Sequence, residues 1–436
     1  MSWPPIRDSS GSVSVWISDM NRPPQTVPNA MSRRLLAISL MYGSQGIPAG
    51  LAFSALSTIL RHSGIPLKQI GLTGLLFLPW ALKCFWSGWT DNAGKKWGYG
   101  RLALWTHASA ILMCLVLGLI APDQHFLLSL SGVFLLNTIF ATQDILTNAC
   151  AVSHMKGRNA GLANALQVIS FLLGMVVGGA GSLLIYDRLG WAGVMGSIAG
   201  ELILLWAALL PLRECVEPAF HHTRQIPSRL ADLFRRPDFR WAMLLSVAFK
   251  FASSALAMLL QPWLIDRSFS LDFAGTLQMS NIICGALGGA LIGFPAVRLM
   301  GSRRAIALLI WPSTLLLGTL FLLQATGTTS RWLLYVGLGA ENMLDGGFYV
   351  SVWALLMDWS SDERPGTDYS FLQCGESLTN VFAGLSIVPL ASLIGYSQTL
   401  LITWITGILM LFFVMSATRK LAAQKHDAPA LSKSPM

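Results

Sequence analysis

The chain has 436 residues, of which 53% are apolar and only 12% are charged, and its net charge is +9. Because soluble domains carry about 25% charged residues, this composition excludes a soluble enzyme, and the apolar content excludes a long disordered chain. In a membrane protein, an excess of Lys and Arg over Asp and Glu reflects the topology of the chain rather than nucleic-acid binding. The six cysteines show no CxxC spacing, so the sequence predicts neither disulfides nor a zinc site.

Residues 1–31 are polar and proline-rich, lack the apolar region of a signal peptide, and predict a disordered cytoplasmic tail. Twelve apolar runs follow, each long enough to cross a bilayer as a helix. They cover residues 34–60, 68–89, 102–121, 126–150, 160–185, 192–212, 240–264, 273–296, 304–324, 332–357, 367–394 and 397–418. The sequence therefore predicts an all-α polytopic membrane protein. Its parts are an N-terminal six-helix bundle at 32–212, a cytoplasmic linker at 213–239, a C-terminal six-helix bundle at 240–418 and a cytoplasmic tail at 419–436.

The basic residues indicate the orientation. With the N-terminus inside, 23 of the 30 Lys and Arg residues fall in predicted cytoplasmic segments and only five in outer loops. Because basic residues are retained on the cytoplasmic side, this bias predicts that both termini are cytoplasmic.

The two halves resemble each other. Asp144 on the fourth span is followed by the basic turn 156–158, and Asp345 on the tenth span is followed by Arg364 in a similar turn. Weak repetition between two six-helix halves is typical of transporters that work by alternating access. Small-residue ridges lie on the fifth and eighth spans, and either pack helices within one half or join the two halves. These ridges are Gly174 and Gly178, and Gly285, Gly289 and Gly293.

Seven charged residues lie inside the predicted spans, although a charge at mid-bilayer costs roughly 2.5–3.5 kcal/mol. They are Lys83, Asp144, Glu201, Lys250, Glu341, Asp345 and Glu376. Polar side chains share helix faces with most of them, which favours a central cavity. The predicted substrate-binding residues are Tyr42, Gln45, Trp80, Gln143, Gln167, Lys250, Gln278, Tyr369 and Gln373.

The intramembrane charges have two interpretations. Lys83 and Asp144 lie at similar depth and could neutralise each other, as Lys250 could with one of the acids in the second half. Alternatively, an acid carries a coupling proton, because carboxylates one helical turn apart repel when both are charged. The candidates are Asp345, Glu376, Glu341 and Asp144. Asp345 is favoured, since it lies nearest mid-span and corresponds to Asp144 in the repeat.

The pattern Gly88-x-x-Asp91-x-x-Gly94-Lys95-Lys96 resembles the signature of the major facilitator superfamily, with its first Gly and Asp one residue closer than usual. The resemblance implies two six-helix bundles around a cavity, with six of the seven charged residues, all but Glu201, on helices that line it. It also implies a gating role for Asp91, Lys95 and Lys96, beside the Lys83–Asp144 pair. Asp91 lies at a helix C-terminus, which disfavours a carboxylate, so we expect it to contact the N-terminus of the eleventh span.

Four shorter stretches are similar to two sister groups within that superfamily, the permeases for ferric siderophores and the muropeptide permeases of cell-wall recycling. They are Leu82-Lys83, Thr142-Gln143-Asp144, Met357-Asp358-Trp359-Ser360 and Gly366-Thr367-Asp368-Tyr369. This resemblance implies a secondary transporter of the inner membrane that imports a ferric siderophore into the cytoplasm with protons. The alternatives are a muropeptide permease and an exporter of drugs or other small molecules.

The sequence lacks the motifs of common nucleotide-binding and catalytic sites. It has no Walker A motif, no HExxH and no evident nucleophile–base pair, so we expect a transporter rather than an enzyme, without cofactor or metal. The expected partners are a small-molecule substrate, protons and the lipid bilayer, not nucleic acid, and the chain is expected to act as a monomer. An intramembrane hydrolase and a non-transporting receptor are the rival classes.

Overall fold

The computed structural model describes residues 27–65, 67–217, 227–327 and 330–427, and every regular element in these ranges is helical. The first half contains α2 (Val27–Gly50), η1 (Leu51–Ala55), α3 (Leu56–His62), α4 (Leu67–Ile70), η2 (Gly71–Phe77), α5 (Leu78–Leu82), α6 (Cys84–Trp97), α7 (Tyr99–Gly118), α8 (Phe126–His154), η3 (Gly157–Asn159), α9 (Ala160–Val176), η4 (Val177–Gly181), α10 (Ser182–Leu209) and η5 (Leu210–Val216).

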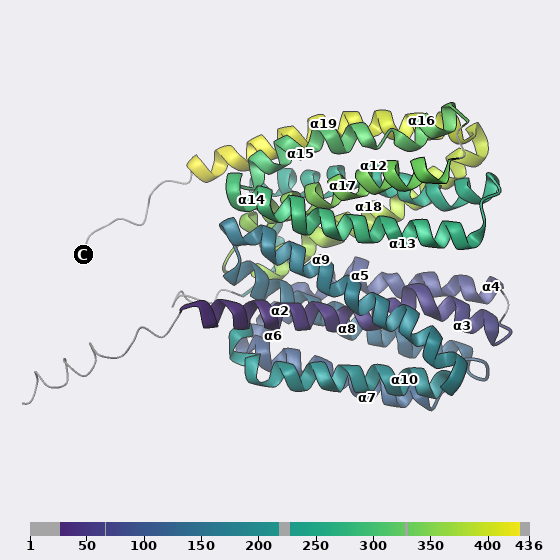
Figure 1. Cartoon of the computed structure of the whole chain (residues 1–436). Helices are drawn as coiled ribbons and strands as arrows, with labels where there is room; N and C mark the ends of the chain where they lie inside the picture. The colour runs from purple at the N-terminus through teal and green to yellow at the C-terminus, as the bar shows by residue number, and fades with distance from the viewer. Residues whose placement is uncertain (1–26, 66, 218–226, 328–329, 428–436) are drawn as a thin grey trace, which may run out of the picture.

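The second half contains α11 (Leu230–Phe234), α12 (Phe239–Asp266), α13 (Leu271–Gly288), η6 (Gly289–Gly293), α14 (Phe294–Met300), α15 (Ser302–Leu316), α16 (Thr319–Ala325), α17 (Arg331–Trp359), α18 (Pro365–Ile394) and α19 (Tyr396–Asp427). Figure 1 shows the two halves side by side, with the helices of both running in nearly the same direction.

The helices of the described ranges make twelve passes through the molecule. Within the described ranges, nine helical segments are long and apolar enough to cross a bilayer. One of these, 157–216, makes two passes, because Gly190 breaks it with a φ of 61° and a ψ of −164°. The run from α4 to α6 and the 29-residue helix α17, which carries Glu341 and Asp345, make the other two.

The boundaries differ from the predicted ones at three places. α2 begins at Val27, inside the predicted tail 1–31, while residues 1–26 lie outside the described residues. The predicted linker 213–239 contains the helical segments η5 and α11, with residues 218–226 outside the description. α19 continues past residue 418 to Asp427, so the predicted tail starts as helix, and residues 428–436 are not described.

The hydrophobic core consists of three clusters of buried side chains, which lie at different positions along the direction of the helices. At the end where α2 begins and α19 ends, here called the terminal side, buried side chains of both halves form one continuous cluster that includes Tyr42 and Trp353. Toward the opposite end each half has its own cluster, one around Trp191 and one around Trp263. The halves are therefore joined through apolar packing mainly on the terminal side.

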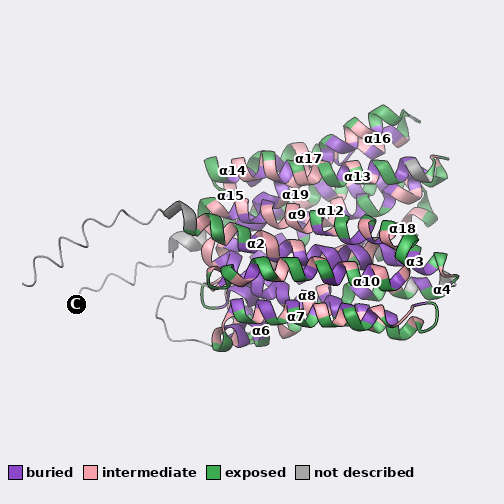
Figure 2. Ribbon diagram, turned by 60° about the horizontal axis from the view of Figure 1, so that its bottom comes forward, coloured by how far each residue is buried: buried purple, intermediate pink, exposed green. Residues whose placement is uncertain are grey.

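Figure 2 shows exposed residues mostly on the outward faces of the helices, and many of these are large and apolar. Phe85, Leu184 and Leu385 each expose 73–74% of their surface. Such a belt would be unfavourable in water, and its natural environment is the hydrocarbon interior of a bilayer.

The glycine ridges pack helices within each half. A Cβ atom on Gly178 of η4 would lie 1.8 Å from the carbonyl oxygen of Ile47, so η4 and α2 approach with their backbones nearly in contact. In the second half, a Cβ atom on Gly288 of α13 would lie 1.8 Å from the carbonyl oxygen of Met343 on α17. The closest backbone approaches of these ridges are within one half. The fifth and eighth spans also meet across the two halves, where α9 lies beside η6 and Gly161 faces Val297.

Candidate functional site

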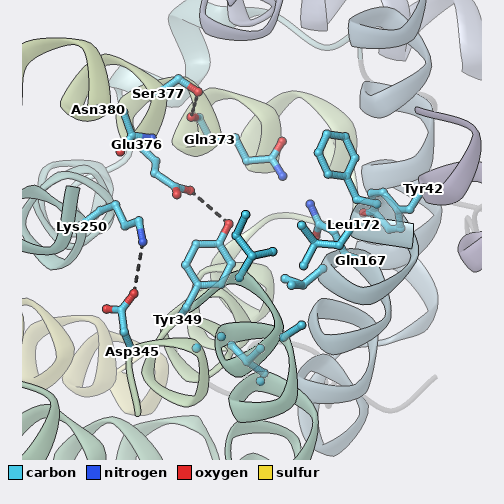
Figure 3. Close-up of a pocket in the computed structure, with 18 of the residues that line it drawn as sticks. Tyr42, Gln167, Leu172, Lys250, Asp345, Tyr349, Gln373, Glu376, Ser377 and Asn380 are labelled. Carbon is cyan, nitrogen blue, oxygen red and sulfur yellow. Dashed lines mark hydrogen bonds and ion pairs between the residues drawn. The ribbon is translucent and has the colours of Figure 1, made fainter. Parts of the chain in front are cut away.

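A central cavity of about 430 Å³ lies between the two halves. Side chains from α2, α5, α8 and α9 line it on one side, and side chains from α12, α13, α17 and α18 line it on the other. Figure 3 shows Tyr42 and Gln167 of the first half across from Lys250, Asp345 and Glu376 of the second half.

The first-half wall has an aromatic and apolar part beside its polar residues. Trp80 meets Phe171 edge to face, with ring centroids 5.9 Å apart, and Val168 and Leu172 continue this surface along α9. The indole nitrogen of Trp80 donates a hydrogen bond to Asn137 Oδ1 at 3.0 Å, which orients the ring. The wall can therefore hold an apolar or ring-shaped portion of a ligand by contact and stacking.

Lys83 and Asp144 form a buried ion pair at the edge of this wall, and their side chains are only 5% and 4% exposed. The Lys83 ammonium also donates to Gln373 Oε1 on α18 at 2.6 Å. Asn148 donates to Asp144 Oδ2 at 2.9 Å and to Gln373 Oε1 at 2.8 Å. The pair is thus the centre of a polar network that links the first half to the second.

The second-half wall carries most of the remaining charge. Lys250 Nζ lies 3.3 Å from Asp345 Oδ2, and the Tyr349 hydroxyl donates to Glu376 Oε2 at 3.4 Å (Figure 3). Asn380 and Ser377 add neutral polar groups on α18. This wall offers one cation, two acids and several amide or hydroxyl groups to a polar ligand.

A second, smaller cavity of about 90 Å³ adjoins the first and lies within the second half. It is lined by Gln278 and Asn281 of α13 and by Glu341 of α17, and it shares Lys250 and Asp345 with the central cavity. Glu341 is 4% exposed and accepts a hydrogen bond from the Asn342 amide at 2.8 Å. The structure therefore places Gln278 and Glu341 in this second cavity, not in the central one.

Asp91 lies on the terminal side, just beyond the predicted end of its span, and it meets the first turn of α18 as its position predicts. It accepts hydrogen bonds from the backbone N–H of Thr367 at 3.4 Å and its hydroxyl at 3.0 Å, and from the hydroxyls of Tyr99 and Ser228 at 2.6 and 3.0 Å. Burial raises the pKa of Asp91, and the hydrogen bonds from Tyr99, Thr367 and Ser228 oppose that rise. The carboxylate holds α6 and α18 together across the two halves.

The two basic residues after Asp91 differ in their surroundings. Lys95 donates to Ser228 Oγ at 2.9 Å, and burial lowers the pKa of its ammonium group. Lys96 is exposed and lies over the ring of Trp97 at 5.1 Å. Lys95 therefore joins the Asp91 cluster through Ser228, whereas Lys96 faces outward beside its neighbour.

Further polar contacts close the terminal side. Lys156 binds Asp362 at 2.5 Å, and the backbone N–H of Gly157 donates to Asp358 Oδ1 at 2.6 Å. Arg236 pairs with the buried Asp368 at 2.9 Å and stacks on Trp359. Nothing local in the sequence distinguishes Arg236 from the other basic residues of the linker, because the return of the linker to α18 is a feature of the tertiary structure.

The predicted substrate residues divide into three groups, one of which is Gln278 alone, in the second cavity. Tyr42, Gln45, Trp80, Gln167, Lys250 and Gln373 line the central cavity. Gln143 and Tyr369 do not: Gln143 is buried and donates to Ser44 Oγ at 3.0 Å, and the Tyr369 hydroxyl donates to Asn164 Oδ1 at 2.7 Å. Both side chains point at neighbouring helices, which helical spacing alone does not distinguish from pointing at a cavity.

Tyr349 and Phe171 line the cavity although the sequence analysis did not select them. Tyr349 follows Asp345 by four residues on α17, so the helical repeat places both on one face and could have indicated it. Phe171 had no such signal, because an aromatic residue in an apolar span is usually packed against lipid or a neighbouring helix.

The model of the Major Facilitator Superfamily matches residues 36–340. The anhydromuropeptide permease of Escherichia coli (strain K12) is 26% identical over 375 residues, which covers 80% of this chain and 72% of the relative. A protein of Rickettsia felis described as putative transporter AmpG 4 is 23% identical over 406 residues, covering 89% of this chain and 97% of the relative.

Two solved structures show the same fold. A bacterial homologue of the iron transporter ferroportin, in an outward-facing state, superimposes with a TM-score of 0.68 at 14% identity, covering 90% of this chain and 99% of the other. The transporter FucP, in an outward conformation, has a TM-score of 0.63 at 13% identity, with 89% and 98% of the two chains covered.

Proposed function

The chain belongs to the Major Facilitator Superfamily, and on that premise we propose that it imports an anhydromuropeptide into the cytoplasm together with protons. Its place would be the inner membrane, with both termini cytoplasmic, as the distribution of basic residues predicts. Of the two substrates expected from the sequence, the relatives support the muropeptide, which was the alternative, rather than the ferric siderophore.

The observation that carries the proposal is the contrast between the two walls of the central cavity. An anhydromuropeptide joins amide-bearing sugar rings to a short peptide with charged ends. The Trp80–Phe171 surface of the first half suits the sugar rings, because aromatic faces bind the apolar faces of rings. Lys250, Asp345 and Glu376 on the opposite wall suit the carboxylate and amine groups of the peptide.

The closed terminal side supports an alternating-access cycle. The contacts of Asp91 and Lys156 with the second half lie there, and so does the core that both halves share. If that side faces the cytoplasm, the described conformation holds the cavity shut toward the cytoplasm. Import then requires these contacts to break while the halves rock about the cavity.

The test is uptake into vesicles that contain the purified protein. Labelled anhydromuropeptide should accumulate above its outside concentration when the outside is acidic, and a protonophore should abolish the accumulation. Lys250→Gln should weaken substrate binding by about tenfold or more, since it removes a charge-assisted contact. Lys420→Gln on α19, which lines neither cavity, is the matched control and should transport normally.

Two results would contradict the proposal separately. Accumulation of ferric siderophore without any anhydromuropeptide uptake would refute the substrate. Undiminished anhydromuropeptide accumulation with the pH gradient collapsed would refute the coupling to protons while leaving the substrate in place.

A further inference from the structure

Glu341 is the most enclosed acid of the second half that has no cationic partner. Among the described residues, Asp144 pairs with Lys83 and Asp345 pairs with Lys250, but no ion pair involves Glu341. Its single hydrogen bond comes from the neighbouring Asn342 amide at 2.8 Å. A buried carboxylate with so little compensation costs several kcal/mol when it is charged, so this environment favours the protonated acid.

Asn281 supplies an independent observation in the same cavity. It is 4% exposed, it lines the second cavity with Glu341, and its Oδ1 atom is buried without a hydrogen-bond partner. An amide oxygen can only accept, so it needs a donor. Gln278 beside it accepts at its Oε1 atom from the Gln261 amide at 3.4 Å, and among the described residues no hydrogen bond joins Gln278 to Asn281 Oδ1.

We propose that Glu341 holds the coupling proton and that its carboxyl O–H is accepted by Asn281 Oδ1, directly or through one water molecule in the second cavity. The role in coupling rests on the proposed function, whereas the protonated site itself does not. Protonation of Glu341 has two favourable effects. It removes the uncompensated negative charge on Glu341, and it provides the hydrogen-bond donor that Asn281 Oδ1 lacks.

The titratable groups around Glu341 distinguish it from the neighbouring acids as the site of the proton. They are Asp345 and Tyr349 on its own helix, Lys250 on α12, Cys284 on α13 and Glu376 on α18. Of the other helices packed against α17, α9 and α16 carry no acidic or basic side chain, and α14 and α15 carry only arginines. Lys250 is the one cation that lines both cavities.

This position of Lys250 connects the proton to the substrate. While Glu341 is neutral, Lys250 stays 3.3 Å from Asp345 at the edge of the central cavity. When Glu341 releases its proton toward the cytoplasm, its new negative charge attracts the Lys250 ammonium into the second cavity. The central cavity then loses its cation, and a substrate carboxylate held there is released. The sequence favoured Asp345 as the proton carrier, but Asp345 has Lys250 as an ion-pair partner, whereas Glu341 has none among the described residues.

The experiment is infrared difference spectroscopy of the purified protein in lipid vesicles, titrated with pH and without substrate. The wild-type protein should show a C=O stretching band of a protonated carboxyl group, and Glu341→Gln should remove that band. Asn281→Leu should keep the band, move it to higher frequency and lower its midpoint by about 0.4–1 pH unit, the equivalent of one neutral hydrogen bond. Glu363→Gln, at an exposed acid that lines neither cavity, is the control and should leave the band unchanged.

Three outcomes would overturn the inference. The band could survive in Glu341→Gln and disappear in Asp345→Asn, which would assign the proton to Asp345. It could stay unshifted in Asn281→Leu, which would remove the proposed acceptor. Sodium chloride could abolish it at constant pH, which would make the second cavity a sodium site. Because no substrate is used, failure of anhydromuropeptide uptake leaves these readouts intact, and Asn281→Leu tests the site even if Glu341→Gln does not fold.

Discussion

The buried pair of Lys83 and Asp144 makes a quantitative prediction about stability. Asp144→Ala leaves the Lys83 ammonium buried, with Gln373 Oε1 at 2.6 Å as its remaining acceptor. Lys83→Ala leaves the Asp144 carboxylate with Asn148 as its donor at 2.9 Å. Breaking a buried pair from one side costs about 3–5 kcal/mol, and because one hydrogen bond survives in each variant we expect about 3 kcal/mol for each.

The double variant removes both charges, so it should lose less than the sum of the two single losses by at least about 2 kcal/mol. The second-half pair of Lys250 and Asp345 is the internal comparison. Its side chains are 22% and 17% exposed and face the cavity, so its coupling energy should stay below about 1 kcal/mol.

The assay is the free energy of unfolding in mixed detergent micelles, measured for the wild-type protein and for the three variants of each pair. Lys83→Ala and Asp144→Ala with strictly additive losses would refute the interaction between them. Equal coupling energies for the two pairs would refute the argument that burial decides the strength.

Two further predictions follow from the topology and from the helix packing. Reporter fusions after Asp123 should be periplasmic and those after Lys156 cytoplasmic, and a cytoplasmic signal after Asp123 would contradict the twelve-pass orientation. Gly178→Ala should destabilise the protein by roughly 1–3 kcal/mol, since its Cβ atom would lie 1.8 Å from the carbonyl oxygen of Ile47. Gly181→Ala, three residues along η4 with no atom within 4 Å of its Cβ position, is the control for thermal unfolding, and equal losses in both would exclude backbone contact as the cause.

The arrangement of twelve passes in two halves was predictable from the sequence. A bilayer forces each crossing segment into about 20 apolar residues that satisfy their own backbone hydrogen bonds, so length and hydropathy carry that information locally. The same holds for the list of intramembrane charges, because each stands out against an apolar run. For Asp91, the predicted contact with the start of α18 is present, although α6 continues to Trp97 and Asp91 therefore does not lie at the helix C-terminus from which the contact was predicted.

Which charge faces which partner was decided only by the tertiary structure. Helical spacing places a side chain on a face, but the neighbouring helix determines whether that face meets a cavity or a packed interface. Gln143 and Tyr369 therefore satisfied the predicted pattern and yet bind Ser44 and Asn164.

The same limit applies to the proton site. Glu341 and Asp345 lie one turn apart and look equivalent along α17. They differ because Lys250, 95 residues before Asp345 on α12, reaches Asp345, while Glu341 lines the second cavity together with Asn281, whose amide oxygen is unpartnered. The sequence determines which charged groups lie inside the bilayer, where burial of a charge costs free energy. The packing of distant helices determines which of these charges has a partner, because the electrostatic energy of a buried group depends on its neighbours in space.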